Sequence, residues 1–171
     1  MTLICATTLV SCSTDRAEIV PTATSPSATG PVFQSKNDAA KHTESLYRTF
    51  LSRTDQLAEA THPNFLRLRE VASERLVANE VEGAHQVKNA GLVTRGATKL
   101  LTFQIQRTDL ASGRTTAYAC VDLSDVKIYK DGESIDSSSR PDRQTTLVTF
   151  VSVSGRLIVD KDDAWSGDST C

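Results

Sequence analysis

The chain has 171 residues, 39% of them hydrophobic, which suits one domain with an ordinary core. Its formal net charge of -2 gives no sign of a basic surface for phosphate groups, so nucleic acid is not expected as a partner. The only apolar run near the N-terminus, residues 2–12, is far shorter than the roughly 20 residues of a membrane-spanning helix.

The first residues, MTLICATTLVSC, resemble a bacterial lipoprotein signal in which Leu9, Val10 and Ser11 form the lipobox before Cys12. In such signals a peptidase cuts before the cysteine. Its thiol carries a diacylglycerol, and chains such as palmitate hold the mature protein on the membrane. The sequence therefore predicts a signal peptide over residues 1–11, lipidation of Cys12 and a secreted protein on the extracytoplasmic face of the cell membrane.

The basic residue that usually opens such a signal is missing, because no charge precedes Asp15. A start codon placed too late would explain this. So would a chance match, in which Cys5 and Cys12 are two small apolar residues of a frayed N-terminus. The cysteine count favours the signal, because cleavage removes Cys5, lipid blocks Cys12, and the even pair Cys120 and Cys171 remains. An even pair of thiols is typical of an oxidising compartment.

A linker is expected between the lipidated residue and the domain. Residues 13–35 are rich in Ser, Thr, Ala and Pro and have no sustained apolar period, so they cannot bury enough surface to become ordered. A flexible coil of this length spans about 25 to 30 Å. We therefore expect a lipidated N-terminus and linker over residues 12–36 and a folded domain over residues 37–171.

Two helices are predicted at the start of the domain. Over residues 37–59 apolar side chains recur with helical spacing, and Asn37 or Asp38 can act as the N-cap. The His62-Pro63 step ends this helix, because the residue before a proline is driven out of the helical region. A second helix is predicted over residues 64–83.

Strands are predicted after Gly91, where the apolar period changes to two. The segments KLLTFQIQRTD and RTTAYACVDLSDVKIY are expected to pair as antiparallel strands, followed by a turn at Asp131-Gly132 and an exposed loop, SIDSSSRPD. A final hairpin is expected about Ser154-Gly155. Two helices before four or five antiparallel strands predict an α+β domain with its helices on one face of a curved sheet.

The second half of the chain resembles one group of proteins in several features. These features are the strand TAYACVDLSDVKIYKDGE, an Arg-containing loop, a Val-rich strand, a strand reaching Trp165 and the terminal Cys171. The group consists of the secreted, often lipidated proteins of actinobacteria and their phages that contain a nuclear-transport-factor-2-like cone. The resemblance covers residues 37–171, although Trp165 lies later than usual. It implies a disulfide between Cys120 and Cys171, and it says little about activity. Such a bond would also hold the polar C-terminal residues and contribute about 4 kcal/mol.

Cone-shaped enzymes use an acid or histidine base beside a tyrosine, and Tyr47, Tyr118 and Asp122 could meet in this way. The spacing of Tyr47 is more typical of core packing, and Asp122 is more typical of a solvated or turn-stabilising carboxylate. His42, His62 and His85 lie too far apart for a metal site. The carboxylates within residues 160–163 could attract a divalent ion, but such runs are usually solvated. We expect no catalytic residue, metal or cofactor.

The leading hypothesis is a non-catalytic lipoprotein that binds an unknown protein or a small apolar ligand. It rests on a clear sequence signal for membrane attachment and on the lack of a recognisable set of catalytic residues in the sequence. One alternative is an isomerase or dehydratase of the cone fold, which requires a deep pocket with an acid within hydrogen-bond reach of a tyrosine. Another alternative is a phage-encoded surface exclusion lipoprotein.

Overall fold

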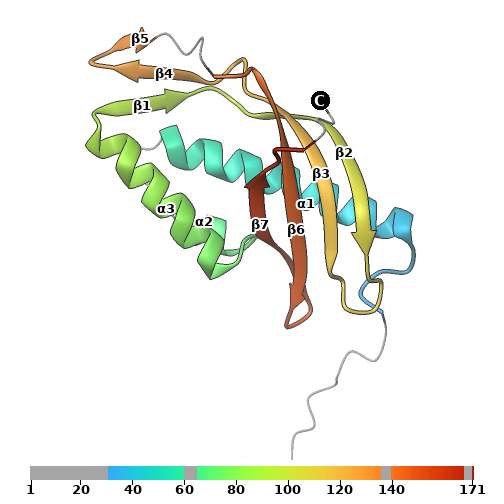
Figure 1. Cartoon of the computed structure of the whole chain (residues 1–171). Coiled ribbons are helices and arrows are strands. Elements are labelled where there is room, and N and C mark those ends of the chain that lie inside the picture. The colour runs from blue at the N-terminus through green and yellow to red at the C-terminus, as the bar shows by residue number, and fades with distance from the viewer. Residues whose placement is uncertain (1–30, 60–64, 136–139, 168–170) are drawn as a thin grey trace, which may run out of the picture.

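The computed structural model describes residues 31–59, 65–135, 140–167 and 171. Within these ranges the helices are α1 (Lys36–Glu59), α2 (Leu66–Arg69) and α3 (Glu74–Asn89). The strands are β1 (Leu92–Arg95), β2 (Lys99–Thr108), β3 (Thr115–Asp122), β4 (Lys127–Lys130), β5 (Glu133–Ile135), β6 (Arg143–Val153) and β7 (Arg156–Ala164), labelled in Figure 1. The expected signal peptide, Cys12 and most of the expected linker lie outside the described residues.

Helix α1 forms where the helical period predicted it and buries one face against the sheet. The buried side chains of this face are Ala39, Thr43, Tyr47, Phe50, Leu51 and Leu57. The cap is Ser35 rather than Asn37, because the Ser35 hydroxyl oxygen accepts the backbone N–H of Asp38 at 3.1 Å. No helix in the described part of the chain is both long and apolar enough to span a membrane.

The second predicted helix is divided into α2 and α3, so the expectation of one helix over residues 64–83 was wrong. Between the two helices the backbone pairs with strand β7: the N–H of Val159 donates to the carbonyl of Val71, and the N–H of Ser73 donates to the carbonyl of Val159, both at 2.8 Å. These bonds require an extended backbone at Ser73. A distant strand therefore outweighs the local helical period.

Helix α3 also runs past the glycine at which the sequence predicted its end. Gly83 lies inside the helix, which continues to Asn89. Gly91 follows with φ +70°, a left-handed conformation that glycine adopts without a steric penalty, and its N–H donates to the Lys88 carbonyl at 2.9 Å. The end of the helix is thus set by Gly91.

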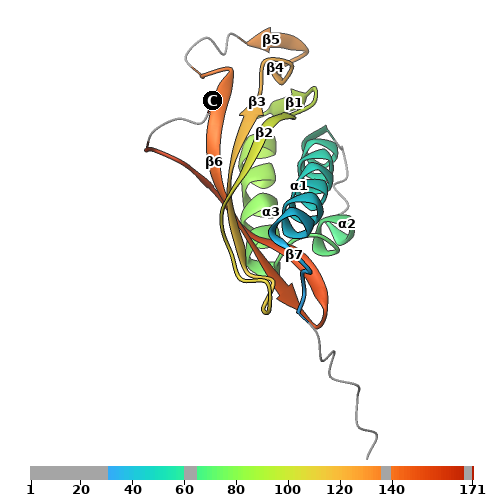
Figure 2. The ribbon, with the colours of Figure 1, turned by 90° about the vertical axis from the view of Figure 1, so that its right-hand side faces the viewer.

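The larger sheet is antiparallel with strand order β2-β3-β6-β7, and Figure 2 shows α1 and α3 on one side of it. The β2–β3 and β6–β7 hairpins are those predicted from the sequence. Aromatic rings fill the space between α1 and the sheet: the Tyr47 ring centroid lies 6.1 Å from that of Phe103 and 6.5 Å from that of Phe150. The hydrophobic core therefore lies between the helices and this sheet.

A second, smaller sheet has strand order β1-β4-β5 and lies beyond one end of the larger sheet in Figure 1. The segment predicted as a single strand over residues 114–129 is interrupted between β3 and β4. Strand β5 occupies the start of the segment predicted as an exposed loop, and β1 was not predicted. Strands β4 and β5 form a hairpin about the predicted Asp131-Gly132 turn, whereas β1 pairs with β4 across more than 30 residues of sequence, which no local pattern indicates.

The predicted fold class, two helices packed on a single curved sheet as in a nuclear-transport-factor-2-like cone, is therefore wrong. Within the described residues there are one long helix, two further helices and two separate antiparallel sheets. The error has a physical cause: the sequence period identifies strands but not the sheet to which each belongs. The turn over residues 123–126, where the N–H of Val126 donates to the Leu123 carbonyl at 3.0 Å, redirects the chain into the second sheet.

The ordered structure begins earlier than the expected boundary at residue 37. Phe33 is buried, and its N–H donates to the Leu110 carbonyl at 3.1 Å. The N–H of Val32 donates to the Ala111 carbonyl at 3.4 Å. The N-terminal side of the domain is thereby attached to the β2–β3 turn.

The C-terminal residue is bonded to the central part of the larger sheet. Cys171 forms a disulfide with Cys120 on β3, with a Cα–Cα distance of 5.1 Å and a sequence separation of 51 residues. The bonded pair is the one that the resemblance implied. Before it, the N–H of Trp165 donates to the Thr145 carbonyl at 2.9 Å.

We expect the double change Cys120→Ser and Cys171→Ser to lower the free energy of unfolding by about 4 kcal/mol, because a closed loop of this length restricts the unfolded chain. Urea denaturation would measure the loss in a chain that also carries Cys12→Ala. The matched control is the same chain with both cysteines kept, with and without reductant. Equal midpoints for the oxidised control and the double variant would contradict the prediction.

Candidate functional site

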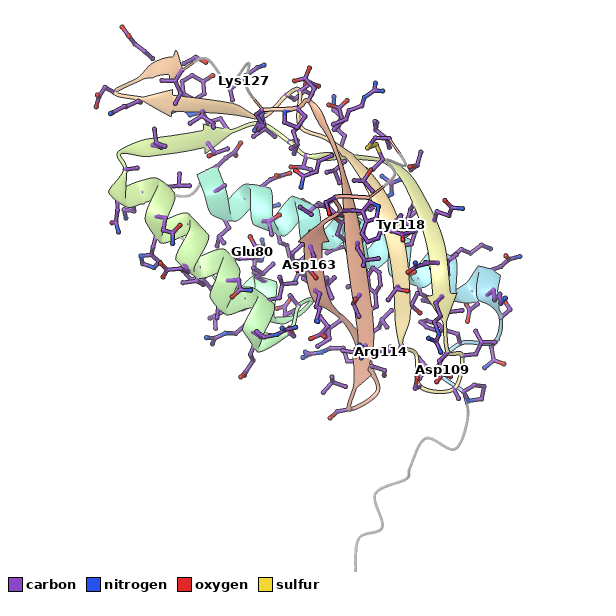
Figure 3. The ribbon with its side chains drawn as sticks, viewed as in Figure 1. Glu80, Asp109, Arg114, Tyr118, Lys127 and Asp163 are labelled. Carbon is purple, nitrogen blue, oxygen red and sulfur yellow. A yellow bond between two sulfur atoms is a disulfide. The ribbon has the colours of Figure 1, made fainter. Side chains whose placement is uncertain are left out.

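The three residues considered as a catalytic group do not meet. Tyr47 is fully buried in the core. Tyr118, labelled in Figure 3, lies on the other face of the sheet, where its ring centroid is 5.0 Å from that of Trp165. The Oδ1 atom of Asp122 accepts the N–H of Ser124 at 2.8 Å, which confirms a turn-stabilising role.

The histidines are also separate from one another. His42 is exposed, with its Nδ1 atom 3.0 Å from an oxygen of Asp38, while His85 stacks on Phe65 with ring centroids 6.5 Å apart. His62 lies outside the described residues. Among the residues that the structure describes, no three His, Cys, Asp or Glu side chains form a group that could hold a metal ion.

A polar cluster lies within the hydrophobic core, formed by Tyr47 of α1, Thr146 of β6 and Asp162 of β7; we call it the Tyr47 cluster. The Tyr47 hydroxyl lies 3.1 Å from Thr146 Oγ1 and donates to Asp162, whose Oδ2 and Oδ1 atoms are at 3.1 and 3.2 Å. Thr146 and Tyr47 are buried and Asp162 is half-buried. A buried hydroxyl is costly without a partner, so these bonds attach α1 to the sheet.

Burial sets the electrostatics of the Tyr47 cluster. It raises the pKa of Asp162 to about 6, although hydrogen bonds from Thr146 and Tyr47 act in the opposite direction. Burial, followed by the negative charge of Asp162, raises the pKa of Tyr47 well above its ordinary value. Tyr47 is therefore a proton donor at any physiological pH, and Asp162 loses its proton in the mildly acidic range.

A cavity of about 420 Å³ lies between the C-terminal half of α1, α3 and β1; we call it the α1–α3–β1 pocket. Its size is within the range of small-molecule sites. Its apolar lining residues are Leu57, Ala58, Ala84, Val87, Leu92 and Val93. The other side chains that line it are polar or charged: Thr54, Glu59, Glu80, Lys88, Thr94 and Arg95. The pocket therefore offers a ligand both apolar contacts and charged groups.

Gly83 forms part of the pocket wall at the middle of α3. A glycine inside a helix destabilises it by roughly 0.5 to 1 kcal/mol relative to alanine. A Cβ atom placed at Gly83 would have no atom within 4 Å, so packing does not require a glycine there. Gly83 is exposed and contributes only backbone to this part of the wall.

Glu80 also lines the pocket, one helical turn before Gly83, and Figure 3 labels it on α3. Its side chain is half-buried and has no hydrogen-bond or ion-pair partner among the described residues. Burial, and then the charge of Asp162, raises the pKa of Glu80. Glu80 thus connects the electrostatics of the pocket with those of the Tyr47 cluster.

Sequence reasoning did not identify the role of either carboxylate: Asp162 was considered only within the run of residues 160–163, which is usually solvated, and Glu80 was not singled out. Strict alternation along β7 from the buried Val159 would place Lys161 and Asp163 toward the core. A register shift makes Val159 pair with Phe150 but Lys161 pair with Thr149, so the next residue, Asp162, faces inward. Glu80 lies in the predicted helical segment, but its place in a pocket depends on where β1 lies against α3, which the sequence does not indicate.

No family model and no curated protein sequence matches the chain. Among solved structures, the chain is similar to the intermembrane space region of the chloroplast protein ARC6, with 13% identity, a TM-score of 0.51, and coverage of 73% of this chain and 95% of that one. It is also similar to the putative transfer protein TraH from the Gram-positive conjugative plasmid pIP501, with 6% identity, a TM-score of 0.45, and coverage of 79% and 98%. At 13% identity, the likeness to the ARC6 region concerns the fold alone, and it replaces the expected two-helix cone.

We expect Asp162→Asn to remove part of the pH dependence of stability. Because burial raises the Asp162 pKa from 3.8 to about 6, the folded state holds more protons than the unfolded state between these values. The contribution of Asp162 to stability is therefore greatest below pH 4 and falls by up to about 3 kcal/mol as the pH rises to 6. The stability of Asp162→Asn relative to the unmodified chain should rise over the same window.

Urea denaturation at intervals between pH 3.5 and 7 would measure this difference. Asp163→Asn is the matched control, because the adjacent Asp163 side chain is exposed and its charge is the smallest of the causes that act on the Asp162 pKa. The difference between this variant and the unmodified chain should change much less with pH than the difference for Asp162→Asn. Parallel pH profiles for Asp162→Asn and the unmodified chain would contradict the inward, desolvated position of Asp162.

Proposed function

We propose that this chain is a lipid-anchored, extracytoplasmic and non-catalytic binding module whose ligand is a small, largely apolar molecule held in the α1–α3–β1 pocket. The observation that carries the proposal is the cavity of about 420 Å³, in which apolar side chains of α1, α3 and β1 lie beside a few charged ones. A concave site of this size, with apolar side chains and a few polar groups, is typical of sites that bind small molecules.

The location rests on the sequence. The lipobox-like residues before Cys12 predict attachment to the membrane, and the Cys120–Cys171 disulfide is typical of a compartment outside the cytoplasm. Residues 13–30 would connect the lipid to the domain. The lipid anchor at Cys12 and the extracytoplasmic location can both be tested without knowledge of the ligand.

The positions of the pocket and of the domain's N-terminal side suit such an anchor. The described chain begins beside the β2–β3 turn, near the start of α1, whereas the pocket is lined by residues 54–59 at the other end of the helix. The 24 residues of α1 span roughly 36 Å. A domain tethered through residue 31 would therefore present its pocket away from the attachment point, where a ligand has free access.

A second candidate function, an isomerase or dehydratase, is favoured by one contact. Asp162 lies within hydrogen-bond reach of the Tyr47 hydroxyl, and its pKa of about 6 would suit a general base. A substrate would have to reach this carboxylate, but Tyr47 is fully buried and neither residue lines the pocket. The Tyr47 cluster is therefore better explained as a structural link between α1 and β7.

We expect Gly83→Phe to abolish binding of the neutral apolar fluorophore N-phenyl-1-naphthylamine, because the ring would occupy the cavity. Gly83→Ala is the matched control: it should keep binding within about threefold and stabilise the helix by roughly 0.5 to 1 kcal/mol. Fluorescence titration and thermal denaturation would measure both effects in the full-length chain carrying Cys12→Ala. Absence of binding to the unmodified pocket, or equal binding by Gly83→Phe, would contradict the proposed function.

We expect Cys12→Ala to release the protein from the membrane fraction, because the thiol that carries the lipid is lost. Globomycin, which blocks the lipoprotein peptidase, should leave a heavier, unprocessed form of the unmodified chain. Fractionation and the intact mass of the membrane-derived protein would measure both outcomes. The control is Cys5→Ala, which should leave anchoring unchanged, whereas membrane association of Cys12→Ala would exclude this anchor.

A further inference from the structure

We infer that the ligand of the α1–α3–β1 pocket carries a protonated amine at one end of an apolar body and that Glu80 is the residue that recognises this amine. The inference rests on the proposed function and adds the chemical class of the ligand. Four charged side chains line the cavity beside its apolar residues: Glu59, Glu80, Lys88 and Arg95.

Glu80 and the basic lining residues occupy different parts of the pocket. Glu80 is half-buried, whereas Lys88 and Arg95 are exposed. Lys88 lies eight residues after Glu80 on α3, which corresponds to about 12 Å along the helix axis. The apolar residues Ala84 and Val87 lie between them in the sequence and line the same cavity. The half-buried charge in the pocket wall is thus acidic, whereas the exposed charged residues are of both signs, Lys88 and Arg95 with Glu59.

The basic residues have interactions outside the cavity. The Arg95 guanidinium lies over the Tyr129 ring, 5.2 Å from its centroid, and Lys88 stands in the last turn of α3, where a cation is favoured by the helix dipole. The remaining acidic lining residue, Glu59, accepts the N–H of Gly96 at 2.9 Å. Among the described residues, neither the Glu80 nor the Lys88 side chain has a hydrogen-bond or ion-pair partner, but Lys88 is exposed to water whereas Glu80 is half-buried. Glu80 is therefore the charged lining residue that gains most from a partner supplied by a ligand.

The surroundings of Glu80 favour a cation over an anion or a neutral group. Asp162, on β7, adds negative charge that acts on Glu80, and the half-buried position of Glu80 removes part of the water around its carboxylate. A carboxylate that has lost water gains most from a charged hydrogen-bond donor, which contributes more than a neutral donor. An ammonium group on an apolar body would supply this donor while its chain contacts Ala84, Val87 and Leu57.

The test compares three probes of similar length: octylamine, 1-octanol and octanoate. Each would displace N-phenyl-1-naphthylamine from the full-length chain carrying Cys12→Ala at pH 7.5. Octylamine is expected to displace it at a concentration at least tenfold lower than 1-octanol, and octanoate should be the weakest. Glu80→Gln should reduce the advantage of octylamine to twofold or less while leaving 1-octanol unchanged.

Glu82→Gln is the matched control, because Glu82 is exposed on the same helix and accepts a hydrogen bond from Gln86 rather than lining the pocket. It removes the same charge and should keep the full advantage of octylamine. Circular dichroism and thermal denaturation would verify that both variants are folded. An advantage that Glu82→Gln lowers as much as Glu80→Gln would overturn the inference, since it would reflect net charge alone.

Other outcomes also distinguish the two proposals. If the fluorophore binds in a manner sensitive to Gly83→Phe but octylamine has no advantage over 1-octanol, the amine inference fails and the proposed function stands. Preferential displacement by octanoate would assign recognition to Lys88 and Arg95 and would overturn the role of Glu80. Fluorophore binding that Gly83→Phe does not affect would reject the pocket itself.

Discussion

The hydroxyl of Tyr47 lies inside a hydrophobic core, and the organisation of the domain depends on the partners it finds there. Thr146 and Asp162 provide them from adjacent strands, at distances close to 3.1 Å. The contact joins residues that are 99 and 115 positions apart, so it forms only when α1 lies across the completed sheet. Loss of the hydroxyl's partners would leave a buried polar group unpaired, a penalty of about 1 to 3 kcal/mol.

This contact has an electrostatic consequence beyond its own position. The Tyr47 hydroxyl holds a carboxylate on the interior side of β7, and that carboxylate acts on Glu80 across the space between β7 and α3. The same half-buried glutamate lines the α1–α3–β1 pocket. The Tyr47–Asp162 hydrogen bond thus helps to set the electrostatic environment of Glu80, a residue that a ligand in the pocket can reach.

The two ends of α1 have different structural roles. At its start, backbone bonds from residues 32 and 33 and the buried Phe33 ring fasten the chain to the β2–β3 turn. At its end, small and apolar residues leave a cavity against α3 and β1. The disulfide from Cys120 to Cys171 secures the C-terminus to the sheet. The pocket is thus left by incomplete packing at one end of a domain that is fastened elsewhere.

The sequence by itself determined α1, the two long hairpins of the larger sheet and the cysteines available for a bond, because helical period, alternation and turn residues are local properties. Tertiary structure alone decided that residues 71–73 leave the helix to pair with Val159, and that β4 joins a second sheet. It also decided that a register shift in β7 turns Asp162 inward. The α1–α3–β1 pocket and the Tyr47 cluster both depend on tertiary structure, since each brings together residues from segments that are distant in the sequence. No local sequence pattern shows which distant segments will pack or pair.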